Sequence, residues 1–216
     1  MHAVFVGHLA VALAAKKVEP RLPLTALVVA TFGLDMLWPA FVLAGLETVR
    51  VDPGNTPFTP LDFVSYPWSH SLVMALGWGA LAGWITARVS NARMGAVMAA
   101  LVVSHWVLDF VSHRPDMPLW PDGPRFGLGL WYSVPLTIAV EGAMLAAGVI
   151  IYVRTAPARD RTGHIALGSL VAVVTAIWLS GPFSPPPPDA VVIGVTGLLG
   201  AALFTAWAWW VQKHRA

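Results

Sequence analysis

The sequence predicts a single all-α helical bundle that crosses a membrane with about seven apolar segments, the first of them short. Of the 216 residues, 57% are hydrophobic and 11% are charged, whereas soluble domains carry about 25% charged residues. The apolar residues form long blocks instead of alternating patterns, which is typical of helices in lipid. We therefore expect one transmembrane domain over residues 1–216, built from helices that satisfy their own backbone within the bilayer.

Composition also excludes several kinds of site. The chain has no cysteine, which removes disulfides, thiolate metal ligands and cysteine nucleophiles together. Its formal net charge is only +2, and its lysines and arginines are scattered between apolar blocks. A nucleic-acid surface needs clustered basic residues, so the partner that composition predicts is the lipid bilayer and not a nucleic acid.

The apolar segments follow one another along the chain at residues 3–15, 22–46, 69–88, 94–113, 130–153, 165–181 and 190–211. The first is shorter than the ~20 residues of a perpendicular span, and its positive charges follow it, unlike those of a signal peptide. We interpret it as a retained helix that is tilted, re-entrant or buried against its neighbours. The breaks are rich in Pro, Gly and charge, as loops are, and the four prolines at 185–188 predict a short stiff connector.

The distribution of basic residues predicts the orientation. Ten of the 13 lysines and arginines lie on alternate loops or at the C-terminus, and only Arg50, Arg114 and Arg125 lie on the intervening loops. Because cytoplasmic loops carry the excess of Lys and Arg, we expect the N-terminus outside and the C-terminus in the cytoplasm. Loops 47–68, 114–129 and 182–189 are then on the extracytoplasmic side of the inner membrane.

Ionisable residues inside the apolar segments are costly in lipid and are candidates for function. By the predicted topology, those of the first four segments occupy the outer halves, so we expect them to surround one cavity open to the outer side. Imidazole nitrogen and carboxylate oxygen suit zinc or a similar divalent ion. The predicted metal ligands are His8, Asp35, His70, His105, Asp109 and His113.

His105 and Asp109 are the central pair of this prediction. They are four residues apart, so they lie one helical turn apart on the same face, and His113 continues that stripe. An intrahelical hydrogen bond between His105 and Asp109 that merely lowers the cost of burial explains the spacing equally well.

Glu141 and Arg114 have open roles. Glu141 lies in the middle of the fifth segment. Its carboxyl group could be a partner of a metal ligand, a proton carrier or a group kept neutral by burial. A structural, hydrogen-bonded carboxyl is an equal alternative. Arg114 suits an anion clamp, and equally an interfacial arginine among lipid headgroups.

A series of short motifs runs through residues 1–130. In chain order they are Gly7-His8, Leu34-Asp35 before Pro39, Trp68-Ser69-His70-Ser71-Leu72, Ser104-His105-x-x-Leu108-Asp109, Pro118-Leu119-Trp120-Pro121 and Arg125-Phe126. This order resembles the YdjM-type family of inner-membrane proteins, which are regarded as metal-dependent hydrolases. The resemblance implies a metal-site half at 1–130 and supporting helices at 131–216.

The order of ligand types is also similar to that of zinc-dependent phospholipase C. That similarity implies one metal held by Asp35, His70, His105 and Asp109, with Asp109 bridging toward a second metal that also takes His8. A metal in such a site lowers the pKa of bound water towards 7 and polarises a phosphoryl or carbonyl oxygen. Asp35 could orient or deprotonate that water.

The chain departs from the YdjM-type pattern in two places. Leu37 and Trp38 stand where that pattern has a second Asp and a His, and Ser65-Tyr66 stands where it has His-Arg. Two ligands and one phosphate-pairing arginine are therefore missing, which favours a mononuclear or a lightly built dinuclear site.

The sequence thus predicts an integral-membrane hydrolase with a divalent metal, zinc in first place, and with Asp35, Glu141 and Arg114 as catalytic residues. It would act on a lipid or lipid-linked ester or phosphoester at the extracytoplasmic face. One alternative is a carrier or channel for protons or divalent ions. The cytoplasmic halves of the apolar segments, however, offer few polar residues that could continue a path for such ions. Another is a scaffold with a structural metal, which would have closed coordination.

Overall fold

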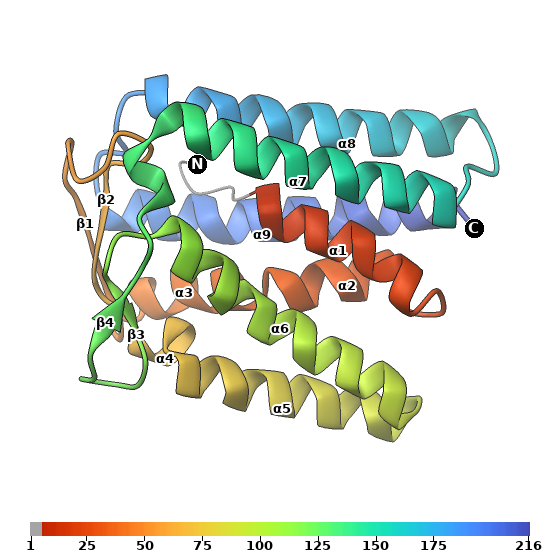
Figure 1. Cartoon of the computed structure of the whole chain (residues 1–216), viewed down its shortest axis with the longest axis horizontal. Helices are drawn as coiled ribbons and strands as arrows, with labels where there is room; N and C mark the ends of the chain where they lie inside the picture. Colours follow the sequence, from red (N-terminus) through yellow and green to blue (C-terminus); the bar gives the residue numbers. More distant parts are fainter. Residues whose placement is uncertain (1–5) are drawn as a thin grey trace.

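The computed structural model describes residues 6–216 as a bundle of long helices with two short β-hairpins across one end (Figure 1). The helices are α1 (Val6–Val18), α2 (Leu24–Thr31), α3 (Gly33–Leu43), α4 (Pro67–His70), α5 (Leu72–Val89), α6 (Ala92–Ser112), α7 (Val134–Thr155), α8 (Arg161–Ser180) and α9 (Ala190–Lys213), with 3-10 turns η1 (Leu130–Tyr132) and η2 (Gly181–Phe183). This architecture agrees with the predicted all-α class.

Five of these helices, α5 to α9, are long and apolar enough to cross a membrane, and the bent pair of α2 and α3 makes six if it is one span. The chain therefore has the helices of a membrane protein, but the predicted count of seven is not confirmed. The difference lies in α1, which has 13 residues. Residues 3–5 of the first predicted segment lie outside the described residues.

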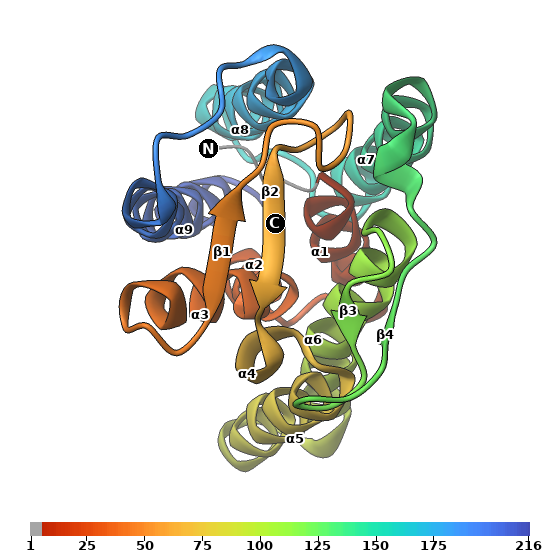
Figure 2. The same cartoon turned by 90° about the vertical axis from the view of Figure 1, so that its left-hand side faces the viewer.

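Helix α1 packs inside the bundle. Of the three interpretations of the first segment, the structure agrees with a helix that is buried against its neighbours. Most residues of α1 are buried, and Figure 2 shows α1 between α2, α6 and α7. The contact with α7 is close at Gly148, where an added Cβ would lie 2.5 Å from the Ala10 carbonyl oxygen. A helix enclosed by other helices does not need the length of a bilayer.

The second predicted segment, 22–46, is not one straight helix. It breaks after Thr31, and α2 and α3 meet at 54°. The Thr31 hydroxyl donates to the Leu27 carbonyl oxygen at 2.9 Å, a back-bond of the kind that bends helices. Gly33, a poor helix former, begins α3.

Two antiparallel hairpins occupy loops that the sequence analysis left without structure. Strand β1 (Thr48–Val51) pairs with β2 (Leu61–Ser65), and β3 (Met117–Pro118) pairs with β4 (Arg125–Phe126). Both hairpins lie at the same end of the bundle, where β1 and β2 cross the helix ends (Figure 2). Three of the connections predicted to share one side of the membrane, including the non-helical prolines 185–188, therefore do gather at one end.

Candidate metal centre

Five of the predicted ligands come together inside the bundle from four helices. They are His8 of α1, Asp35 of α3, His70 at the end of α4, and His105 and Asp109 of α6. Their side-chain atoms form two groups, each with all ligand atoms within 4.8 Å of one another: one contains His8, His105 and Asp109, and the other Asp35, His70 and His105. His105 belongs to both groups and is the centre of the cluster.

The distances around His105 match those expected for ligands of one ion. Its Nε2 lies 3.1 Å from Asp109 Oδ2 and 3.2 Å from His70 Nε2. Asp35 Oδ1 lies 3.7 Å from His105 Nε2 and 3.6 Å from His70 Nε2. Two ligand atoms on a tetrahedral zinc with bonds of ~2.1 Å lie about 3.4 Å apart. The donor types and their spacing therefore fit a divalent ion.

Asp109 presents its two oxygens to different partners. Oδ2 faces His105 and lies 3.6 Å from His70 Nε2, whereas Oδ1 lies 3.2 Å from His8 Nε2. The rings of His8 and His105 are stacked, with centroids 3.8 Å apart. Asp109 thus has one oxygen near His8 and the other near His105 and His70; its bridging role and the number of metals remain predictions.

A backbone carbonyl orients the His105 ring. Nδ1 of His105 lies 2.7 Å from the carbonyl oxygen of Thr31. Because a carbonyl only accepts hydrogen bonds, Nδ1 carries the proton and Nε2 keeps the lone pair that a metal needs. Thr31 is the last residue of α2, where carbonyls lack helical partners, so the break between α2 and α3 supplies this acceptor.

A buried carboxylate orients the His70 ring through a hydroxyl. Ser69 Oγ donates to Glu47 Oε2 at 2.7 Å and lies 2.7 Å from His70 Nδ1. The hydroxyl proton is directed to Glu47, so Ser69 Oγ accepts from Nδ1 and leaves the Nε2 lone pair facing the cluster. Glu47 also accepts from the Ser69 backbone N–H at 2.8 Å and is 3% exposed.

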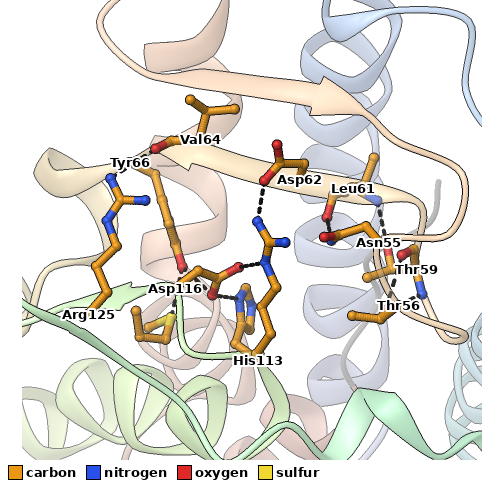
Figure 3. A network of polar contacts seen from close by, with 12 residues as sticks. Asn55, Thr56, Thr59, Leu61, Asp62, Val64, Tyr66, His113, Asp116 and Arg125 are labelled. Carbon is orange, nitrogen blue, oxygen red and sulfur yellow. Dashed lines mark hydrogen bonds and ion pairs between the residues drawn. The ribbon is translucent and has the colours of Figure 1, made fainter.

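His113 and Arg114 lie in a separate polar network over the end of α6. Asp116 accepts from Tyr66 and lies 3.0 Å from His113 Nδ1 (Figure 3). Arg114 contacts both Asp116 and Asp62, and the second of these pairs ties the β1–β2 hairpin to the end of α6. Among the described residues, His113 belongs to neither ligand group, and Arg114 is already paired with two carboxylates.

The contacts of this network favour the charged forms of both Asp116 and His113. Burial raises the pKa of Asp116, but the hydrogen bonds from His113 and Arg114 outweigh burial and lower it. Burial likewise disfavours the charged form of His113, and the bond to Asp116 outweighs that effect and raises the pKa of His113. The β1–β2 hairpin is therefore fastened to the end of α6 by a partly buried ion pair, in which the Asp62 side chain is 8% and the Arg114 side chain 32% exposed.

Glu141 is fully buried in α7 and is also outside both ligand groups. Within the described part of the chain, its two carboxyl oxygens and the indole nitrogens of Trp131 and Trp178 have no hydrogen-bond partner at normal distances. Glu141 therefore lies inside the bundle with the indole N–H groups of Trp131 and Trp178 as neighbouring donors, and its predicted catalytic role stays a prediction.

The groups that orient the ligands could not be predicted from the sequence. Glu47 gave no signal, because an acidic residue at the end of an apolar segment is ordinary loop chemistry. Ser69 was noted only as part of a motif, and the Thr31 carbonyl carries no sequence information at all. These partners depend on the hairpin and the helix break, neither of which was predicted.

One side of the cluster opens into a cavity. The Asp35 side chain is 29% exposed, whereas those of His70, His105 and Asp109 are at most 5% exposed. Asp35 lines an elongated cavity of about 410 Å³ between α3 and α9. A molecule that reaches the cluster through this cavity therefore meets Asp35 first.

Comparison with protein-family models, curated proteins and solved structures finds no match to this chain. The YdjM-type resemblance accordingly stays a prediction. The buried His and Asp groups could bind a metal ion on the chemistry and geometry of the residues themselves.

Proposed function

We propose that this chain is an integral-membrane hydrolase that uses a divalent metal, zinc in first place, to cleave a lipid or lipid-linked ester or phosphoester. One observation carries the proposal: a buried His and Asp cluster with metal-ligand spacing is open at Asp35, which lines a largely apolar cavity. A purely structural metal would have closed coordination, whereas a catalytic metal keeps one position open.

The residues of the cluster would divide into those that bind the metal and one that binds the metal or orients its water. His70, His105 and Asp109 are the buried ligands, with His8 beside the second oxygen of Asp109. A bound divalent ion would supply an acidified water and would polarise the carbonyl or phosphoryl oxygen of the substrate. Asp35, the exposed member, would either complete the coordination or orient that water.

The proposed side of action is the extracytoplasmic face. The hairpins and the connection at 181–189 lie at one end of the bundle, and the end with the C-terminus holds ten of the 13 basic residues. The positive-inside bias assigns that basic end to the cytoplasm. The cluster would then be reached from the bilayer or from the outer side.

Metal analysis of purified protein tests the site. Wild-type protein should contain zinc or another divalent metal after purification, and His105→Ala and Asp109→Ala should lose it while still inserting in the membrane. His164→Ala is the matched control, because His164 is exposed on α8 and outside the cluster. Full metal occupancy in the two cluster variants would rule out the assignment.

Activity separates the hydrolase from the carrier. The metal-loaded protein in vesicles of a total bacterial lipid extract should release a water-soluble headgroup or a free acyl chain, detected by mass spectrometry, and His105→Ala should not. Metal flux across the same vesicles without lipid cleavage would replace the hydrolase with the carrier alternative.

A further inference from the structure

The cavity beside Asp35 is long and largely apolar. It lies between α2 and α3 on one side and α9 on the other, and the prolines at 185–188 contribute to one end. Along α9 its lining runs from Val192 to Phe204, which is about 18 Å at 1.5 Å per residue. Its volume of about 410 Å³ is that of a small-molecule site.

The polar groups of this cavity are few and close in sequence. Asp35 and Trp38 both line it. The indole nitrogen of Trp38 is buried and has no hydrogen-bond partner within residues 6–216. This nitrogen is enclosed by protein atoms, so Asp35 is the polar side chain of this pair that a ligand in the cavity would meet. The remaining polar lining residue, Thr196, donates to the Val192 carbonyl of its own helix at 2.7 Å.

Small residues on α9 keep the space open. Gly197 allows α9 to approach Pro39 of α3, because an added Cβ there would lie 2.8 Å from the proline ring. Gly200 and Ala201, one turn further along α9, line the cavity itself. Leu199 and Leu203 of the same helix do not line it and are 65% and 51% exposed, as expected of residues that face lipid.

A second, open hollow lies next to the cavity. It lies between α2 and α9 and shares Met36 and Ala201 with the cavity. Its other lining residues are mostly small: Thr25, Val29, Ala202, Thr205, Ala206 and Trp209. Because α9 is long and apolar enough to cross a membrane, a hollow on the side of this helix would face the acyl region of the bilayer.

We propose that the cavity holds one hydrocarbon chain of a membrane lipid, which enters sideways between α2 and α9, and that the bond next to that chain lies beside Asp35. The chain would run along α9 between Phe204 and Val192. This inference rests on the proposed hydrolase for the fate of the bond, but the seating of the chain stands independently of it.

Photolabelling with a lipid probe tests the seating. The full-length protein is reconstituted in phosphatidylethanolamine and phosphatidylglycerol vesicles that contain a phospholipid with a diazirine in one acyl chain. After illumination, adducts are mapped by mass spectrometry. We expect adducts at the cavity residues Phe204 and Met36 in addition to those at the lipid-facing residues Leu199 and Leu203.

Filling the cavity should remove only the cavity adducts. Gly200→Phe places a ring in the lining and should lower labelling of Phe204 roughly tenfold, because the occupied volume excludes the chain. Ala201→Leu is a milder second variant with the same expected direction. The control Leu199→Phe adds a ring to the lipid-facing side of the same helix and should leave the Phe204 adducts unchanged.

The outcomes separate the inference from the proposed function. Unchanged Phe204 labelling in both Gly200→Phe and Ala201→Leu, with normal labelling at Leu203, would overturn the seating of the chain whether or not lipids are cleaved. Loss of labelling in these variants but not in His105→Ala supports the seating. Cavity labelling in wild-type protein that cleaves no lipid would contradict the hydrolase and leave the seating intact.

Discussion

At the scale of single residues, the orientation of two imidazole rings decides which nitrogens can bind a metal. His105 is fixed by a carbonyl and His70 by Ser69 and Glu47. Both rings keep their Nδ1 protonated, so both Nε2 atoms are directed to the same point. Such partners of metal ligands affect affinity although they never touch the metal.

Glu47→Gln tests this arrangement. The amide keeps the shape of Glu47 but presents only one acceptor to the two Ser69 donors, so the His70 ring loses its fixed orientation. We expect metal affinity to fall about 10- to 100-fold, measured by competition with a chelator of known affinity. Asp52→Asn, an exposed carboxylate of the same hairpin, is the control. Equal affinity in both variants would show that Glu47 does not orient His70.

Asp160 gives a pH dependence at the other end of the bundle. The hydrogen bond from His214, followed by that from the Gly163 backbone N–H, lowers the pKa of Asp160. A lowered pKa stabilises the folded state at pH values above the pKa of Asp in the unfolded chain, which is about 3.9. That contribution is lost as pH falls from there toward the folded pKa. Asp160→Asn should therefore lose less stability than wild type as pH is lowered below about 3.9, measured by thermal unfolding in detergent.

At the scale of elements, helix breaks and close helix contacts position the ligands. Asp35 follows the break between α2 and α3, and His70 stands at the junction of α4 and α5. His105 and Asp109 lie on α6, which packs tightly on α5. An added Cβ at Gly95 would lie 2.5 Å from the Gly83 carbonyl oxygen. That contact fixes the spacing between α6, the helix of His105, and α5, which begins just after His70.

Gly95→Ala should separate α5 from α6. The methyl group meets backbone, which cannot move away as a side chain can, so we expect a loss of about 1–3 kcal/mol from overpacking and a lower melting temperature in detergent. Gly77→Ala is the matched control, since nothing lies within 4 Å of its added Cβ and alanine favours the helix. Equal melting temperatures for the two variants would contradict the close contact.

At the scale of the whole molecule, the bundle has two chemically different ends. One end carries the hairpins and the 181–189 connection, and the other carries the C-terminus and the short basic loops. The cluster lies inside the bundle between these ends, with its cavity along α9. Because the two ends differ, the orientation of the bundle in the membrane decides at which face the proposed hydrolysis takes place.

Single-cysteine labelling tests the orientation, and the absence of native cysteine makes the experiment direct. A membrane-impermeant maleimide added to intact cells with a permeabilised outer membrane should label Asp52→Cys. It should label Arg159→Cys only after the inner membrane is also opened. Both positions are exposed loops at opposite ends of the bundle. The reverse pattern would invert the orientation and move the proposed action to the cytoplasmic face.

The sequence alone predicted the apolar helices and most of the residues that gather in the cluster. Block hydrophobicity does this because lipid demands long apolar stretches, and ionisable residues within them stand out by their cost. Five of the six predicted ligands do lie together. The exception, His113, shares the helical stripe of His105 and Asp109 but lies just beyond Ser112, the last residue of α6.

Only the tertiary structure decided the rest. The kink after Thr31, the hairpin that brings Glu47 to Ser69, and the cavity between α3 and α9 all arise from contacts between segments far apart in the chain. Periodicity and spacing describe neighbours within one helix, so they give no information on such contacts. The sequence by itself determined which groups are costly to bury; the packing of the helices determined which of those groups face one another and from which side they are reached.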